Sequence, residues 1–465
     1  MSRYSFLGIL KAIVYNPRQM GTPQVQYLLF FHIDQLRLCR TQELAHPRTS
    51  LLLQTLQAIF CPLLDYLTVR GRRKMAPASP LARLPPELKQ EILSALPDVW
   101  SLRSMALTCS SFYSAFINAE RLITTRVLKN HVDADLIPDA TAALRSSQLK
   151  PRTWREICDF ASEHLFSRAS PPASWTTLDA LAVSNLHSCV EYWSEKFVKE
   201  MFNTASTFAY IDAPPAGPLS QNEKNRIQRA LYRFEVYQNL CRDCDVGENR
   251  GLFICTFSNC ENEQLASVHD YLFRAICPAY NDLFERTGNA FTAVDLVEYG
   301  DDFDADPIQR LLSRGLTHLR QIVDLDFGEA QHRALDSLRS PARNPLYAAL
   351  KDANAADDGV YLSEYNQEEQ NRLARKTLPL IQDPDRGPLD AWAWAHQRQS
   401  RSDFVYSDSQ IALRARGYCM WDCARLEQWH IFQKAWEAPN YPYQGDEQMS
   451  RKAEMEMWCE KHPQY

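Results

Sequence analysis

Apolar residues recur at every third or fourth position through most of the chain, a spacing that predicts α-helices. The clearest short example lies between Pro85 and Pro97. Proline suits the first turn of a helix, where its missing N–H costs nothing, and it cannot continue a helix that has already formed. The apolar residues that share one face of this predicted helix are Leu88, Ile92 and Leu96.

Two further short helices are predicted directly after the first. Ser101 is the expected N-cap of one, ahead of Leu102, and the other begins near Cys109 and carries Phe112. Three short helices within about 40 residues bury little apolar surface on their own. The surplus of apolar residues in this three-helix segment therefore indicates a partner protein.

Longer helices are predicted from residue 151 onward. Apolar stripes favour one long helix over residues 178–201 and another over residues 264–277, which Pro278 interrupts or kinks. A capping box is a Ser or Thr followed three residues later by Glu or Gln, and it marks a helix start. The matches are Thr153 with Glu156 and Ser220 with Glu223.

Low glycine content and the scarcity of alternating strand patterns predict the fold class. The chain of 465 residues has 14 glycines, below the usual ~7%, and few β-branched runs alternate with polar residues. We expect an all-α protein in which the short three-helix segment, residues 75–128, precedes a large irregular α-helical domain. That domain spans residues 129–437, and residues 438–465 form a loosely ordered tail. No repeat of fixed period indicates a leucine-rich or WD-type domain.

Charge sets residues 1–74 apart from the rest of the chain. They hold ten Lys/Arg and three Asp/Glu, a net charge of +7, so the remainder carries −13 within an overall charge of −6. We expect this basic leader to be poorly ordered or not part of the working protein, with Met75 as an alternative start. The acidic body does not suit nucleic acid, whose phosphates favour basic surfaces, so no nucleic-acid partner is expected.

Residues 51–69 form a stretch with few charges that is long enough to be considered as a membrane anchor. It contains Gln54, Gln57, Pro62 and Asp65. An aspartate alone costs ~2.5–3.5 kcal/mol at the centre of a bilayer. The stretch is therefore a poor membrane anchor, and we do not expect a membrane partner.

Cysteines offer the clearest candidate for metal binding. The chain has 13, an odd number without a dense framework, which indicates reduced thiols and a location in the nucleus or cytoplasm. Cys241, Cys244, Cys255 and Cys260 have a spacing within reach of a small zinc loop, because structural zinc takes four thiolate or imidazole ligands. The alternative is that they pack as small apolar residues, since Cys241 continues an apolar helix. We favour packing, and therefore expect no metal and no cofactor.

Enzyme signatures are missing from the sequence. It has no phosphate-binding glycine loop, no H-E-x-x-H and no G-x-S-x-G, and histidines such as His269 and His396 are interpreted as structural. We therefore expect no enzyme. A dense C-terminal aromatic cluster is either a recognition pocket or, as we favour, the core that closes the helical domain. Its residues are Trp392, Trp394, Phe404, Tyr406, Tyr418, Trp421, Trp429, Phe432 and Trp436.

The order of residues in the three-helix segment resembles the F-box. The matching motif reads Leu84-Pro85-x-Glu87-Leu88-x-x-x-Ile92-x-x-x-Leu96-Pro97, then Ser101-Leu102 and Leu107-Thr108-Cys109-x-x-Phe112. F-box proteins dock on the Skp adaptor of SCF-type cullin–RING ubiquitin ligases, and members with long helical C-terminal regions are frequent in filamentous fungi. The resemblance implies that the adaptor-facing residues are Leu84, Pro85, Leu88, Ile92, Leu96, Leu102, Leu107 and Phe112.

The resemblance further implies a substrate receptor without catalytic residues of its own. Its partners would be the Skp adaptor, through it a cullin, and an unknown target protein held by the helical domain. Ubiquitin transfer would be done by the RING subunit and its E2, and the receptor would act by proximity. The alternative is an adaptor-independent helical interaction protein, with a zinc site at Cys241, Cys244, Cys255 and Cys260 as one way of stabilising it.

Overall fold

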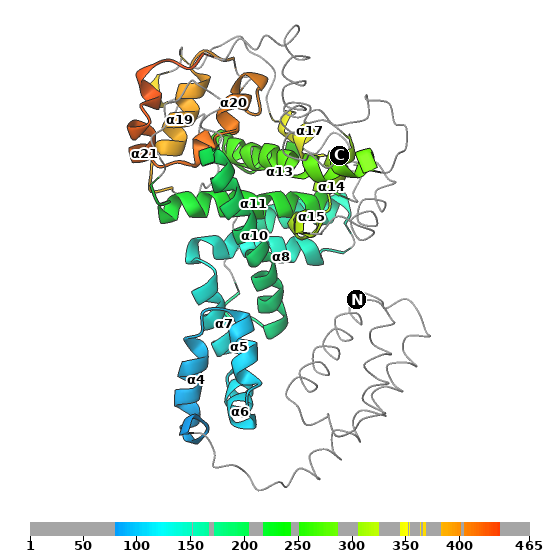
Figure 1. Cartoon of the computed structure of the whole chain (residues 1–465), viewed down its shortest axis with the longest axis vertical. Coiled ribbons are helices and arrows are strands. Elements are labelled where there is room, and N and C mark those ends of the chain that lie inside the picture. The colour runs from blue at the N-terminus through cyan, green and yellow to red at the C-terminus, as the bar shows by residue number, and fades with distance from the viewer. Residues whose placement is uncertain are drawn as a thin grey trace. The chain divides into compact units, whose positions relative to one another are not determined.

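The computed structural model confirms the all-α class: in the part of the chain that it describes, every regular element is a helix (Figure 1). The described residues are 80–150, 152–166, 172–203, 217–242, 251–286, 306–324, 345–351, 353, 363, 366–368, 383–400 and 404–437. The chain divides into two units, Met1–Arg83 and Leu84–Tyr465, and the helices discussed below belong to the second. The predicted leader, residues 1–74, and the predicted tail, residues 438–465, lie outside the described residues.

The second unit begins with four short helices and continues with longer ones. The first four are α4 (Pro86–Ser94), α5 (Val99–Ala106), α6 (Ser110–Asn118) and α7 (Glu120–His131). The following ones are α8 (Ile137–Gln148), α9 (Trp154–Phe160), α10 (Thr177–Asn203), α11 (Gln221–Cys241), α12 (Gly251–Cys255) and α13 (Asn259–Arg286). The remaining α-helices are α14 (Asp306–Leu312), α15 (Leu316–Asp324), α17 (Leu346–Lys351), α19 (Gly387–His396), α20 (Ile411–Arg414) and α21 (Cys423–Gln428).

The starts and ends of the short helices follow local chemistry. Pro86 occupies the first turn of α4, as expected, but the helix ends at Ser94, so Leu96 lies beyond it. The residue before a proline is pushed away from the helical region, which accounts for this early end before Pro97. The N-cap of α5 is Asp98 rather than the predicted Ser101, whose backbone N–H donates to Asp98 at 2.7 Å.

Helix α7 connects the short helices to the body. It contacts α4, α5 and α6 on one side and α10 on the other. The Asn130 side-chain amide donates to the backbone carbonyls of Ser94 and Leu96, both at 2.9 Å, and so satisfies acceptors at the end of α4. At the start of α10, the Thr177 hydroxyl donates to the Glu120 carboxylate at 2.6 Å. These bonds join the short helices to the body through side chains of α7 and its neighbours.

Helices α11 and α13 form the centre of the body. They contact one another, α8 and α10 pack against α11, and α14, α15 and α17 pack against α13 (Figure 1). The predicted helix over residues 178–201 is confirmed as α10, and both predicted capping boxes are present, Thr153 with Glu156 and Ser220 with Glu223. Of the two outcomes predicted for Pro278, an interruption or a kink, the structure excludes the interruption, because α13 continues to Arg286.

The C-terminal segment, residues 383–437, is joined to α11 by buried ion pairs. Arg226 donates to both carboxylate oxygens of Asp383, at 2.6 and 2.7 Å, and to Asp422 at 2.7 Å. Arg425 donates to both carboxylate oxygens of Glu223 at 2.7 Å. Burial alone would lower the pKa of Arg226, but the hydrogen bonds and charges of its two aspartates raise it. Buried charges are tolerated when they are paired. Helix α11 can therefore occupy the centre of the core although it carries polar and charged residues.

A second polar cluster joins the same segment to α13. Arg414 donates to Asp270 at 2.7 Å, and the Tyr406 hydroxyl donates to the other oxygen of that carboxylate at 3.0 Å. Nearby, the Tyr418 hydroxyl donates to Glu263 at 3.0 Å. Burial alone would raise the pKa of Asp270, but the charge of Arg414 and the hydrogen bonds lower it. The carboxylate therefore stays ionised inside the core.

The C-terminal aromatic cluster closes this core. Trp392 and Trp421 are 0% exposed, and Trp394, Trp429 and Trp436 are partly buried against the same core. The indole N–H of Trp421 donates to the backbone carbonyl of Arg416 at 2.8 Å. The two fully buried tryptophans thus belong to the core that we predicted, and do not line a pocket.

Candidate functional site

Exposed apolar side chains gather on the short helices. Among the described residues, eight large apolar side chains are strongly exposed, and six of them lie on α4–α7 or in the turn after α5. We call these six the exposed apolar set. Single exposed apolar residues are normal, whereas a large contiguous exposed apolar patch is typical of an interaction site. The set consists of Leu88, Trp100, Leu107, Tyr113, Ile117 and Leu122, with exposed fractions from 39% to 54%.

Helix α4 shows how the sequence produces this arrangement. Leu93 is 0% exposed and Lys89 is 5% exposed, so these residues form the inward face. Leu88 is 51% exposed on the opposite side, and Ile92 lies half-buried one turn later. Of the predicted apolar stripe, Leu88 is therefore exposed, whereas Ile92 and Leu96 are half-buried against the core. Lys89 and Leu93 hold the helix on its neighbours.

The eight predicted adaptor-facing residues separate into three groups by exposure. Two of them, Leu102 and Phe112, are 1% and 2% exposed and belong to the core. Leu102 shares its inward row on α5 with Val99 and Ala106. In this structure these two residues support the helices from within. Exposed members are Pro85, Leu88 and Leu107, and half-buried members are Leu84, Ile92 and Leu96.

Four members of the exposed apolar set were not predicted as contact residues. Tyr113 and Ile117 lie at i and i+4 on α6, on the side away from the inward Phe112 and Phe116. The spacing of apolar residues on α6 could have identified this exposed pair. A short helix with apolar residues on two sides must leave one of those sides exposed. The other two are Trp100 and Leu122.

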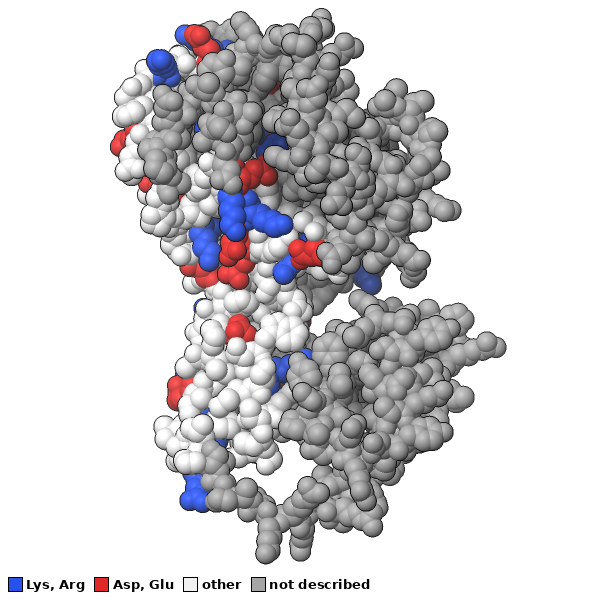
Figure 2. Space-filling view, viewed as in Figure 1, with Lys and Arg blue, Asp and Glu red and all other residues white. Residues whose placement is uncertain are grey.

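Side-chain bonds hold α4 against α6 and α7. Lys89 donates to the hydroxyl of Ser111, and the Gln90 amide donates to the backbone carbonyl of Ala115 at 3.1 Å. Arg126 of α7 donates to Glu91 at 2.9 Å. On the face of the molecule seen in Figure 2, the part that holds these helices carries few charged side chains. These side-chain bonds hold α4 in place while Leu88 stays exposed.

The cysteines proposed for zinc do not form a ligand cluster in the part of the chain that the structure describes. Cys241 and Cys260 are buried, Cys255 is exposed, and Cys244 lies outside the described residues. Burial raises the pKa of Cys260 to about 12, and the charge of Glu261 adds to this.

Another group of metal-ligand side chains is brought together at the junction of α7 and α10. Within the described ranges, the group of three or more such residues close enough to hold an ion is His131, His187 and Glu191. Burial, with the charges of His131 and Lys224, lowers the pKa of His187 to about 3. This group was not predicted. The i, i+4 spacing of His187 and Glu191 on a predicted helix was visible in the sequence, but nothing there connected His131 to them.

The histidines that we interpreted as structural are fully buried in the body. His269 lies 3.0 Å from the Asp270 carboxylate, and His396 Nδ1 lies 2.8 Å from the backbone carbonyl of Trp392. Both side chains are 0% exposed.

No described helix is both long enough and apolar enough to cross a membrane, and the candidate stretch at residues 51–69 lies outside the described residues. Comparison of the chain with protein-family models, curated proteins and solved structures gives no match.

Proposed function

We propose that this protein is the substrate receptor of an SCF-type cullin–RING ubiquitin ligase, and that α4–α7 dock on the Skp adaptor. The observation that carries the proposal is the exposed apolar set, which lies on the segment whose residue order resembles the F-box. The helical body would hold the target protein, and the ligase subunits would supply the chemistry.

The exposure of individual side chains is consistent with this role. Specific interfaces bury on the order of 800 Å² per partner, and their energy is concentrated in a few apolar or aromatic side chains. Leu88, Trp100 and Leu107 are 51%, 39% and 40% exposed, so each can lose further surface to a partner. Their positions on α4, α5 and the turn after α5 place them on consecutive elements of the motif.

Titration calorimetry of the full chain with a purified Skp-type adaptor tests the proposal. We expect saturable binding, and we expect Leu88→Arg to weaken it by at least ~2 kcal/mol, about 30-fold, because an unpaired charge would enter the interface. Leu178→Arg is the matched control: Leu178 is 65% exposed at the start of α10, outside the proposed surface. It should leave the affinity unchanged.

The variants are informative because Leu88 and Leu178 are both more than half exposed, so neither substitution disturbs the core. Circular dichroism melts should give wild-type midpoints for both. If the wild-type chain shows no binding at tens of micromolar adaptor, the receptor proposal is wrong. Equal weakening by the two substitutions would place the contact elsewhere.

The rival proposal is an adaptor-independent interaction protein. The same exposed apolar set would then serve a different helical or apolar partner. Affinity purification of the wild-type chain beside Leu88→Arg separates the two proposals, since the receptor proposal requires that adaptor and cullin are both lost from the variant.

A further inference from the structure

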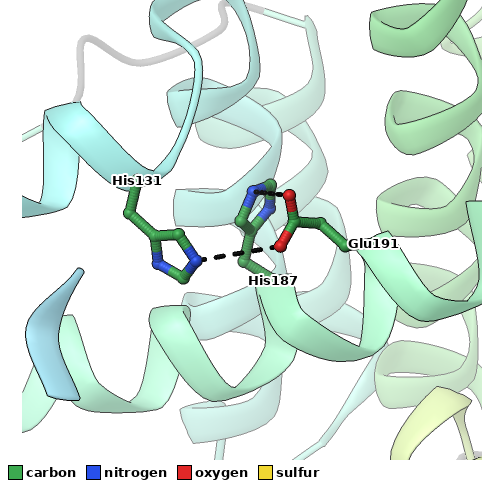
Figure 3. Close-up of side chains that lie close together, drawn as sticks. All are labelled: His131, His187 and Glu191. Carbon is green, nitrogen blue, oxygen red and sulfur yellow. Dashed lines mark ion pairs between the residues drawn. The ribbon is translucent and has the colours of Figure 1, made fainter. Parts of the chain in front are cut away.

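Three side chains from two helices meet where the short helices join the body. His131 is the last residue of α7, and His187 and Glu191 lie one turn apart on α10 (Figure 3). We propose that His131, His187 and Glu191 bind a divalent transition-metal ion, and that Zn²⁺ is the ion their two imidazoles and one carboxylate fit best. None of the three residues belongs to the exposed apolar set, so this proposal does not depend on adaptor docking.

The distances are close to those of a coordination sphere. His131 Nε2 lies 3.9 Å from one oxygen of Glu191, and His187 Nε2 lies 3.8 Å from the other. One ligand atom of each residue falls within 4.8 Å of the other two. Zinc bonds of about 2.0–2.2 Å at tetrahedral angles would place ligand atoms roughly 3.3–3.5 Å apart. Small side-chain rotations would therefore bring all three onto one ion.

Both imidazoles have a partner on the nitrogen that faces away from the site. His131 Nδ1 lies 2.9 Å from the Ser184 hydroxyl, and His187 Nδ1 lies 2.8 Å from the Tyr232 hydroxyl. When Nδ1–H donates to such an oxygen, the lone pair of Nε2 is left for a metal. Metal-binding histidines almost always have this kind of outer partner, which fixes the ring and its tautomer.

Access and charge also suit a metal ion. The side chain of His187 is 3% exposed and that of His131 14% exposed, whereas the Glu191 side chain is 36% exposed. The carboxylate side therefore leaves room for ion entry and for a water as fourth ligand. Two neutral imidazoles and one carboxylate are typical of zinc sites that keep an open position.

Lys224 is the competitor for the carboxylate. Its ammonium nitrogen lies 3.7 Å from Glu191 Oε1, and its side chain is 45% exposed. Because an exposed lysine can rotate into water, it can give up Glu191 when an ion arrives. Its charge nevertheless opposes a nearby cation, so removal of Lys224 should tighten metal binding. The bound ion would connect the end of α7 directly to α10, in addition to the hydrogen bonds already present.

The test measures zinc bound to the full chain after it has been stripped with a chelator. We expect about one zinc per chain at low micromolar free zinc, with a nitrogen and oxygen shell at about 2.0–2.1 Å by X-ray absorption. Glu191→Gln and His131→Gln should each weaken binding at least roughly tenfold, Tyr232→Phe should weaken it by about 10–100-fold, and Lys224→Met should strengthen it.

A matched control uses another His–Glu pair of the same chain. Glu163 lies 3.9 Å from His164 Nε2, and no second histidine forms a ligand group with them among the described residues. Glu163→Gln should leave zinc affinity unchanged. A shell made of sulfur at about 2.3 Å would mean that cysteines hold the metal, and would overturn the proposal.

Two other results would also overturn it: no zinc retained by the wild-type chain, or wild-type affinity in Glu191→Gln. Misfolding of a ligand variant does not leave the proposal untested, because Lys224→Met must bind zinc more tightly than the wild type. An unchanged or lower affinity in that variant would contradict the proposed site.

Discussion

Arg226 joins three segments that are far apart in the sequence. Its guanidinium, on α11, contacts Asp383 before α19, Asp422 before α21 and the backbone carbonyl of Met420 at 3.0 Å. The side chain is 1% exposed, whereas Asp383 and Asp422 are 25% and 18% exposed. Breaking such a group leaves uncompensated charge in the interior, which is more costly than the pairing itself is favourable.

We therefore expect Arg226→Met to lower the free energy of unfolding by about 3–5 kcal/mol, because two partly buried carboxylates lose their cation. The control is Arg386→Met, since Arg386 is 62% exposed and forms an i, i+4 pair with Asp390 at 3.3 Å. An exposed pair of this kind contributes about 0.3–0.5 kcal/mol. Urea unfolding of the two variants measures the difference, and equal losses would contradict the role assigned to Arg226.

His396 predicts how stability depends on pH. Burial, together with the charge of Arg414, lowers its pKa from 6.5 to about 4, despite the hydrogen bond to Trp392. The unfolded chain therefore takes up this proton at a higher pH than the folded chain does. The stabilisation is fully present above about pH 6.5 and is lost as the pH falls toward 4, by about 3 kcal/mol.

The measurement compares wild type with His396→Phe by chemical unfolding at several pH values. His396 stacks on Trp392 with ring centroids 4.8 Å apart, and phenylalanine can preserve that stacking without titrating. We expect the difference in unfolding free energy between the two proteins to change in favour of the variant between pH 6.5 and pH 4. A difference that stays constant over this range would mean that His396 titrates normally.

At the scale of elements, Trp421 and Trp100 contribute to different parts of the structure. Trp421 is 0% exposed and packs on Phe202 of α10, with ring centroids 5.3 Å apart. Trp100, on α5, is 39% exposed and belongs to the exposed apolar set. Trp421 connects the C-terminal segment to α10, whereas the side chain of Trp100 is available to a partner.

Trp421→Ala should cost ~3–5 kcal/mol of stability, as truncation of a buried tryptophan does. Trp100→Ala should leave stability within about 1 kcal/mol of wild type and weaken adaptor binding. Thermal melts give the stability of each variant, and calorimetry gives the affinity of each for the adaptor. A wild-type melt for Trp421→Ala would contradict its place in the core, and full adaptor affinity for Trp100→Ala would remove it from the docking surface.

At the scale of the whole molecule, local sequence patterns predicted individual helices better than they predicted how the helices pack on one another. The two capping boxes and helix α10 were predictable because their signals lie within a few turns. The burial of α11 could not be predicted from its polar sequence, since Arg226 and Glu223 look like surface residues until their partners, 157 to 202 positions away, are known. Ion pairs between residues far apart in the chain produce no periodic pattern in a single sequence.

The same limit applied to the candidate sites. Spacing placed Leu88, Ile92 and Leu96 on one face, whereas the resemblance placed Leu102 and Phe112 among the adaptor-facing residues although they lie in the core. A short helix with apolar residues on several sides does not reveal which side is buried, because that depends on its neighbours. His131 was missed for a related reason, since its two companions belong to a helix that the chain reaches only after α8 and α9.

Hydrogen exchange of the full chain, with and without saturating Skp-type adaptor, tests the central claim most directly. The receptor proposal predicts slower exchange in peptides that cover α4, α5 and α6, while α11 and α13 keep the exchange rates of the free chain. Slower exchange confined to the body, or no difference at an adaptor concentration well above the measured Kd, would contradict the claim that these short helices are the docking surface.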